Sequence, residues 1–90
     1  MFYEWDEAKA AFNLRKHGVA FDDVRHFDFE RALETVDERR DYGERRMIAY
    51  APLHGRLHAL VYVLRADAIR IIGLRRANDR ERQAYEQRQT

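Results

Sequence analysis

One stretch of the sequence is apolar on both of its alternating faces. Residues 57–64 are rich in Val, Leu and Tyr, which favour β-strands. A strand with one buried face alternates apolar and polar residues, so this stretch predicts a central strand that is covered on both sides. Helices from the first third of the chain can cover one side. The other side requires the C-terminal helix, a partner protein, or both.

Short turns separate this strand from its neighbours. His54-Gly55 precedes the strand expected at residues 56–64, and Asp67 follows it. Turns of this length require antiparallel hairpins, so we expect a meander. The four expected strands are residues 32–36, 46–53, 56–64 and 68–75, and residues 2–5 are a candidate additional edge strand.

Capping residues mark two helices before the strands. Asp6 is a candidate N-cap and Gly18 a candidate left-handed C-cap, which predicts a helix over about residues 7–17. We expect its buried face to consist of small and aromatic side chains, namely Ala8, Ala11 and Phe12. A brief second helix is expected from Asp23 to Phe27 or Phe29.

A last helix is expected over residues 79–87. Asn78 and Glu81 have the spacing of a capping box, but only Ala84 and Tyr85 are available for burial, so this helix should dock weakly. The order of elements predicts one α+β domain spanning residues 1–90, with two N-terminal helices, an antiparallel four-stranded meander sheet and a C-terminal helix.

Charge is distributed unevenly although the net charge is only +1. Residues 1–44 carry 7 Lys/Arg and 12 Asp/Glu, a net charge of −5, whereas residues 45–90 carry 10 and 4, a net charge of +6. The second half contains no lysine, so its ten cations are all arginines, whose planar fork binds phosphate through two parallel hydrogen bonds. This half therefore predicts a phosphate-binding face. The ordinary alternative is that these arginines are solvated ends of strands and helices.

Several classes of protein are disfavoured by what the sequence lacks. It contains neither Cys nor Ser, which removes disulfides, thiolate metal sites and the common nucleophiles of acyl transfer. The histidines and glycines form no metal-binding or phosphate-loop motif, so we expect no metal and no cofactor. No apolar run approaches the roughly 18 residues of a membrane span, and the first residues do not resemble a signal peptide. We therefore expect a cytoplasmic protein without membrane contact.

The remaining candidates for chemistry are cations and histidines. Metal-free RNA cleavage needs a base for the 2′-hydroxyl, cations that stabilise the phosphorane, and an acid for the leaving oxygen. His17 lies at an expected helix C-terminus, where the charged imidazolium is favoured, so it is a candidate acid and equally a helix cap. Further candidates are Lys16, Arg45, Arg46, Arg75, Arg76 and Tyr85.

Blocks spread over the whole chain resemble the BrnT family of toxins. They correspond in order to the family patterns FEWDxxK, NxxKHGVxF, YGExR, GRL, RIISxRKA and ERxxY. Each block alone is short, but their order is specific. In this sequence they are residues 2–9, 13–21, 41–46, 55–57, 70–77 and 81–85.

The resemblance implies a RelE-like fold and a ribonuclease toxin of a type II toxin–antitoxin system, which inhibits translation by cutting RNA. It implies neutralisation by a BrnA-like ribbon-helix-helix antitoxin, and binding of operator DNA only through the toxin–antitoxin complex. On this reading the catalytic residues are Lys16, His17, Arg45, Arg75 and Tyr85. The RNA-binding residues are Arg46, Arg56, Arg70 and Arg76.

One departure from the family pattern bears on activity. The family often has Ser and a small residue before an Arg-Lys pair, where this chain has Gly73-Leu74 before Arg75-Arg76. A hydroxyl and a lysine of tunable pKa are therefore missing, and activity would be weaker if position 76 supplied the catalytic acid.

A second hypothesis makes the chain a non-catalytic binding subunit, which partners the antitoxin as a co-repressor in an autoregulatory DNA-binding complex. The polar last helix and the doubly apolar central strand favour it. An exposed sheet face also predicts that the chain forms a homodimer when no antitoxin is bound.

Overall fold

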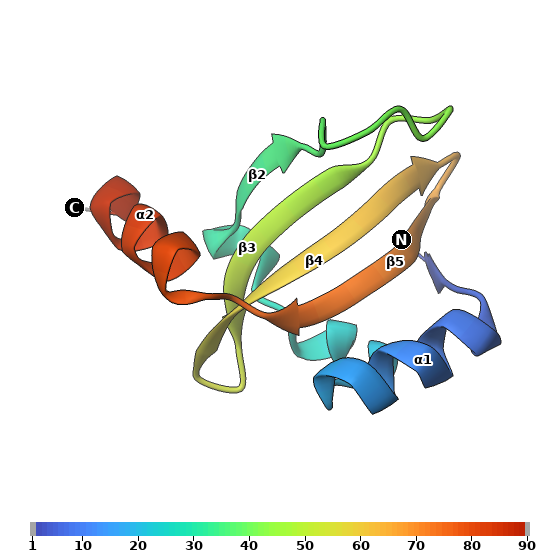
Figure 1. Cartoon of the computed structure of the whole chain (residues 1–90), viewed down its shortest axis with the longest axis horizontal. Coiled ribbons are helices and arrows are strands. Elements are labelled where there is room, and N and C mark those ends of the chain that lie inside the picture. The colour runs from blue at the N-terminus through green and yellow to red at the C-terminus, as the bar shows by residue number, and fades with distance from the viewer. Residues whose placement is uncertain (1, 90) are drawn as a thin grey trace.

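The computed structural model describes residues 2–89, in which a five-stranded sheet is flanked by helices (Figure 1). Along the chain the elements are β1 (Phe2–Glu4), α1 (Glu7–His17), the 3₁₀ helices η1 (Phe21–His26) and η2 (Phe29–Arg31), β2 (Leu33–Val36), β3 (Met47–Leu53), β4 (Arg56–Arg65), β5 (Ala68–Arg76) and α2 (Asp79–Gln89). The strand order in the sheet is β1-β5-β4-β3-β2.

The expected meander is present, but the sheet is mixed and has a fifth strand. Strands β2 to β5 pair antiparallel with their neighbours, whereas β1 pairs parallel with β5 and places Phe2 opposite Ala68. The expectation of a four-stranded antiparallel sheet is therefore corrected. Turn residues reveal hairpins between consecutive strands, but they carry no information about pairing between segments more than sixty residues apart in the chain.

The second N-terminal helix is not an α-helix, which also corrects the expectation. Its place is taken by η1 and η2, between which Phe27 has an extended backbone with ψ 126°. The apolar residues Phe21, Val24 and Phe27 recur every three positions and all are buried. A spacing of three matches the 3₁₀ period, so this segment turns one row of side chains towards the sheet.

Helix α1 has the expected bounds but a different buried face. Asp6 caps its start by accepting a hydrogen bond from the Lys9 amide (3.0 Å), and Gly18 closes its end with φ 71°. Asn13 is its buried residue, whereas Phe12 is exposed. Ala8 and Ala11 are exposed as well, and Ala10 packs against the core instead. The centre of this face is polar, so hydrophobic periodicity could not identify it.

The two faces of the sheet carry separate clusters of buried side chains. The larger cluster lies beneath η1 and includes Leu60, Tyr62 and Leu74. The smaller one contains Ile48, Ala59 and Val61. Strand β4 contributes to both clusters, as its doubly apolar pattern predicted.

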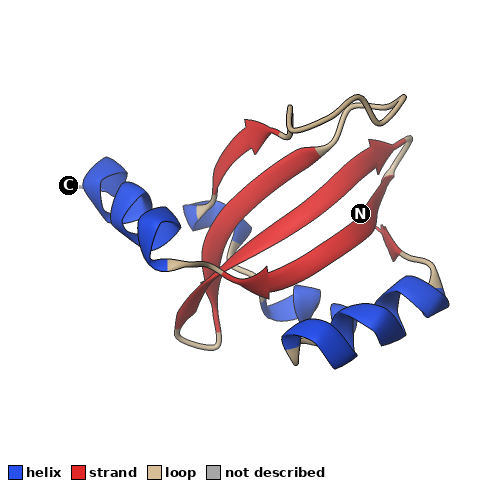
Figure 2. Ribbon diagram, viewed as in Figure 1, coloured by secondary structure: helices blue, strands red, loops and turns tan. Residues whose placement is uncertain are grey.

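Helix α2 does not cover the smaller cluster. It begins after the end of β5 and projects beyond the sheet (Figure 2), and none of its residues is buried. The capping box is confirmed, because the Glu81 amide donates to Asn78 Oδ1 (2.8 Å) and the Asn78 amide donates to the Glu81 carboxylate (2.9 Å).

Strand β5 has one more residue than β4 over the segment in which the two strands pair. Val61 is opposite Gly73 but Tyr62 is opposite Ile71, so Ile72 forms a β-bulge without a Cα partner. Because of this bulge, Ile71 and Leu74 both point into the larger cluster. Arg75 is then opposite Ala59, on the face of the smaller cluster.

Candidate active site

Helix α1 is fastened to β5 by the side chain of Asn13, which is 8% exposed. Its Nδ2 donates to the carbonyl oxygens of Leu74 (2.7 Å) and Val19 (3.0 Å), and its Oδ1 accepts from the Leu74 amide (3.2 Å). Residues three and four positions further along a helix share its face. Lys16 and His17 are therefore held beside the same strand that carries Arg75.

A groove of about 360 Å³ lies between α1, β5 and the loop before β3. Five of its lining residues are lysines or arginines, and they come from three distant stretches of the chain. None of the residues that line it is acidic. The lining residues are Lys9, Phe12, Asn13, Lys16, His17, Arg39, Arg46, Val61, Ile72, Gly73, Leu74 and Arg75.

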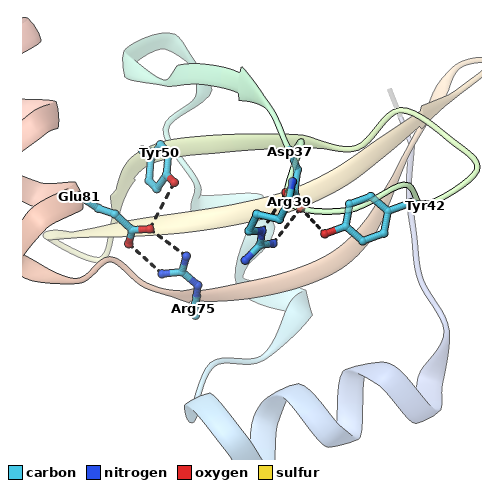
Figure 3. A network of polar contacts seen from close by, with 6 residues as sticks. All are labelled: Asp37, Arg39, Tyr42, Tyr50, Arg75 and Glu81. Atoms are coloured by element: carbon cyan, nitrogen blue, oxygen red, sulfur yellow. Dashed lines mark hydrogen bonds and ion pairs between the residues drawn. The ribbon is translucent and has the colours of Figure 1, made fainter.

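A buried carboxylate organises the loop that supplies two of these cations (Figure 3). Asp37 accepts two hydrogen bonds of 2.8 Å from the Arg39 guanidinium and one of 3.0 Å from the Tyr42 hydroxyl. These contacts hold the pKa of Asp37 well below its ordinary value, with the Arg39 hydrogen bond as the largest cause. The Asp37 amide also donates to the Arg46 carbonyl (2.8 Å), which closes the loop at its base.

Arg46 lies against the groove with part of its hydrogen-bonding capacity unused. Its guanidinium carbon is 3.9 Å from the centroid of the Tyr42 ring, a cation–π contact. Its Nε is buried and has no hydrogen-bond partner among the described residues. A buried donor without a partner is costly, so an anion that accepts from Arg46 would relieve this cost.

Arg75 forms a two-pronged ion pair with Glu81 of α2 (Figure 3). Its two terminal nitrogens lie 2.8 and 2.9 Å from the Glu81 carboxylate oxygens. The Tyr50 hydroxyl donates to the same carboxylate (3.3 Å). The pair raises the pKa of Arg75 and lowers that of Glu81 through these hydrogen bonds.

The histidine of the groove differs from the expectation based on its helix position. The pKa of His17 is lowered, first by burial and then by the charges of Lys16 and Arg75. The expectation of a favoured imidazolium is therefore wrong, because burial and two neighbouring cations outweigh the partial negative charge of the helix C-terminus. A neutral imidazole near pH 7 can accept a proton.

The groove brings together four of the predicted site residues, namely Lys16, His17, Arg46 and Arg75. Arg45 is exposed outside the groove, and Arg70 is paired with Glu4 (3.7 Å). Three more, Arg56, Arg76 and Tyr85, line a separate hollow between the β3–β4 turn and α2. In that hollow the Tyr85 hydroxyl donates to the Arg31 carbonyl (2.7 Å).

Sequence reasoning missed three charged or aromatic residues of the groove. Arg39 stands in a charged turn that carried no site signal, Lys9 was noted only as part of a family block, and Phe12 was expected on the buried face of the first helix. Asn13 belongs to one of the blocks quoted above, yet its role in joining α1 to β5 depends on residues about sixty positions away. The one local signal is the asparagine in the middle of a helix, because Asn is unfavourable in a helix interior unless its side chain has a hydrogen-bond partner.

Within residues 2–89, no three His, Asp or Glu side chains come together as a metal site would require. None of the helices described there is long and apolar enough to cross a membrane.

Comparison with known proteins identifies the class. Residues 5–81 match the family described as ribonuclease toxin, BrnT, of type II toxin–antitoxin systems. The class that this match defines is that of ribonuclease toxins. The match spans most of the sequence, and the chain belongs to the BrnT family. Membership in a type II system implies a protein antitoxin as partner.

A solved structure supports this assignment. The crystal structure of the ribonuclease toxin BrnT of Brucella abortus is similar with a TM-score of 0.66 and 25% sequence identity. The similarity covers 88% of this chain and 100% of that chain. A search of curated proteins finds no match.

Proposed function

We propose that this chain is a metal-independent endoribonuclease that inhibits translation by cutting RNA and is neutralised by a BrnA-like ribbon-helix-helix antitoxin. The observation that carries the proposal is the convergence of Lys16, His17, Arg46 and Arg75 on one groove. A phosphodiester in this groove would meet cations from three stretches of chain and a histidine with a lowered pKa. That combination supplies the groups that metal-free cleavage of RNA requires.

The proposed reaction begins at the 2′-hydroxyl of the nucleotide before the scissile bond. Neutral His17 accepts its proton, and the 2′-oxygen attacks phosphorus while the bond to the 5′-oxygen breaks. Arg46 and Arg75 stabilise the negative charge of the phosphorane. Lys16 donates a proton to the leaving 5′-oxygen, so the products are a 2′,3′-cyclic phosphate and a 5′-hydroxyl end.

The ion pair with Glu81 fits this role of Arg75. Glu81 engages the two terminal nitrogens, which leaves the Nε–H as a donor for phosphate. A guanidinium that is already fixed in place loses little freedom when substrate binds. Glu81 therefore holds Arg75 in position while part of its donor capacity remains available.

The test is RNA cleavage by the purified chain with and without a metal chelator, using Arg75→Gln and Arg70→Gln as a matched pair. The two arginine side chains are 27% and 28% exposed, and each is paired with a glutamate. Loss of charge stabilisation in the transition state predicts that Arg75→Gln slows cleavage by roughly 10²- to 10³-fold. Arg70→Gln and the chelator should have little effect.

Equal losses in the two variants, or loss of cleavage with the chelator, would contradict the proposal. Translation and neutralisation need a test in cells. Expression of the chain alone should stop protein synthesis and growth, expression of Arg75→Gln should not, and co-expression of the ribbon-helix-helix partner should restore growth. Growth arrest by both forms would exclude cleavage as its cause.

A further inference from the structure

Phe12 is a large aromatic side chain that neither core uses. It is 49% exposed, and it belongs to neither cluster of buried side chains nor to the apolar residues packed against them. It lies on α1, one residue before Asn13, and lines the cationic groove. Packing of the core therefore does not account for an aromatic residue at this position.

The surroundings of this ring are strongly basic. The Lys16 ammonium lies 5.7 Å from the ring centroid, a cation–π distance. Lys9, Arg39 and Arg46 line the same groove. Of the groove cations, Arg39 and Arg75 have carboxylate partners from outside the groove, Asp37 and Glu81.

An exposed aromatic ring among cations is the combination that binds single-stranded nucleic acid. The cations follow the phosphates, and unpaired bases stack on the ring whatever their identity, because every base has a π face. A duplex buries these base faces within its own stack and presents mainly its backbone. An acidic peptide would satisfy the cations, but it would leave the flat ring without a matching surface.

We propose that Phe12 stacks on an unpaired base of RNA bound in the groove, and that the groove accepts single strands and excludes duplexes. This inference rests on the proposed function, since it takes RNA to be the ligand. It adds a contact between Phe12 and a base to the proposed contacts of Arg46 and Arg75 with phosphate.

The experiment measures binding of 2′-O-methyl RNA oligonucleotides, which lack the attacking hydroxyl and cannot be cleaved by the proposed reaction. Three probes are compared: a single strand, the same strand in a duplex, and the same strand with abasic sites. The variants are Phe12→Ala, Phe12→Leu and Phe12→Trp. Leu14→Ala is the matched control, because Leu14 is 50% exposed on the same helix and does not line the groove.

Loss of one stacked base should weaken binding of the single strand by about 5- to 10-fold in Phe12→Ala and Phe12→Leu. Leu14→Ala should stay within about twofold of the unmodified chain. Phe12→Trp should bind at least as tightly, and the introduced indole should lose fluorescence on binding. The abasic strand should bind weakly and equally to the unmodified chain and to Phe12→Ala, and the duplex should bind weakly to all forms.

Three results would overturn the stacking contact. They are equal effects of Phe12→Ala on intact and abasic strands, no difference between Phe12→Ala and Leu14→Ala, and loss of antitoxin binding in Phe12→Ala with unchanged RNA binding. If Arg75→Gln loses RNA binding in the same assay, the proposed function survives these results. Failure of the unmodified chain to bind any single strand would overturn both. Because Phe12→Leu keeps an apolar side chain, a matching melting temperature shows that its loss of binding is not unfolding.

Discussion

The carboxamide of Asn13 bonds to both backbone groups of Leu74, and so it takes the place of a neighbouring strand. Strand β1 pairs with β5 only as far as Arg70, so the edge of β5 beyond that point is covered by α1. The two hydrogen bonds measure 2.7 and 3.2 Å. One side chain thereby satisfies the backbone hydrogen-bonding groups of Leu74 and sets the distance between α1 and the sheet. The width of the groove depends on this distance.

Removal of this side chain should destabilise the fold. Asn13→Ala leaves the amide and carbonyl of Leu74 buried without partners, which should cost about 2–4 kcal/mol of unfolding free energy. Urea denaturation measures the change. Leu14→Ala, an exposed change on the same helix, should stay within about 0.5 kcal/mol of the unmodified chain. Equal stability of the two variants would show that the contact does not stabilise the fold.

The titration of His17 should respond to its neighbour Lys16. Lys16 is one of the causes that lower the pKa of His17, so Lys16→Gln should raise this pKa. Lys16→Gln also removes the proposed acid, so cleavage by this variant cannot report the shift. NMR titration of the His17 ring measures the shift independently of cleavage. Arg15→Gln is the control, because Arg15 is not among the groups that shift His17.

Acid should release α2 from the sheet. The folded pKa of Glu81 is lowered, so its contribution to stability is fully present above about pH 4.5 and is lost as the pH falls through the folded value. Glu81→Gln should mimic this at neutral pH, with about 1–3 kcal/mol less protection of α2 amides in hydrogen exchange. Glu86→Gln, an exposed change on the same helix, should leave protection unchanged. Unchanged protection in Glu81→Gln would show that the ion pair does not hold α2.

Asp37 should control the order of the loop that carries Arg39 and Arg46. Asp37→Asn removes the charge that Arg39 and Tyr42 bind. The free energy of unfolding should fall by about 2 kcal/mol, a moderate loss because water already screens the exposed Arg39 guanidinium. Because the loop that carries Arg39 and Arg46 becomes less ordered in this variant, its affinity for the 2′-O-methyl RNA strand should also fall. The pKa of Asp37 is lowered in the folded chain, so its contribution to stability is fully present above about pH 3.8 and is lost only as the pH falls further. Glu38→Gln, an exposed neighbour, should change neither quantity.

Local signals in the sequence predicted the elements well. Asp6, Gly18, Asn78 and Glu81 act as the caps that their residue types indicated, and the antiparallel hairpins follow from short turns. Long-range pairings were not predictable in this way. The parallel contact of β1 with β5 and the bonds of Asn13 to Leu74 each join segments about sixty residues apart.

The candidate site was predictable in part. Basic residues were named from composition and from the family resemblance, but composition does not say which arginines share a face. Arg75 and Arg76 are adjacent in sequence, yet they line different hollows because alternate residues of a strand point to opposite faces. Gly73 was the available signal of the irregularity beside them, since an isolated glycine within a strand often marks a bulge.

The bulge at Ile72 makes the length of β5 as important as its composition. Side-chain direction along a regular strand alternates with a period of two, so Ile71 and Leu74, three positions apart, would lie on opposite faces. Without the bulge, the same sequence would turn Leu74 towards the groove and Arg75 into the larger cluster. The extra residue at Ile72 prevents this, because Leu74 and Arg75 stay opposite Leu60 and Ala59.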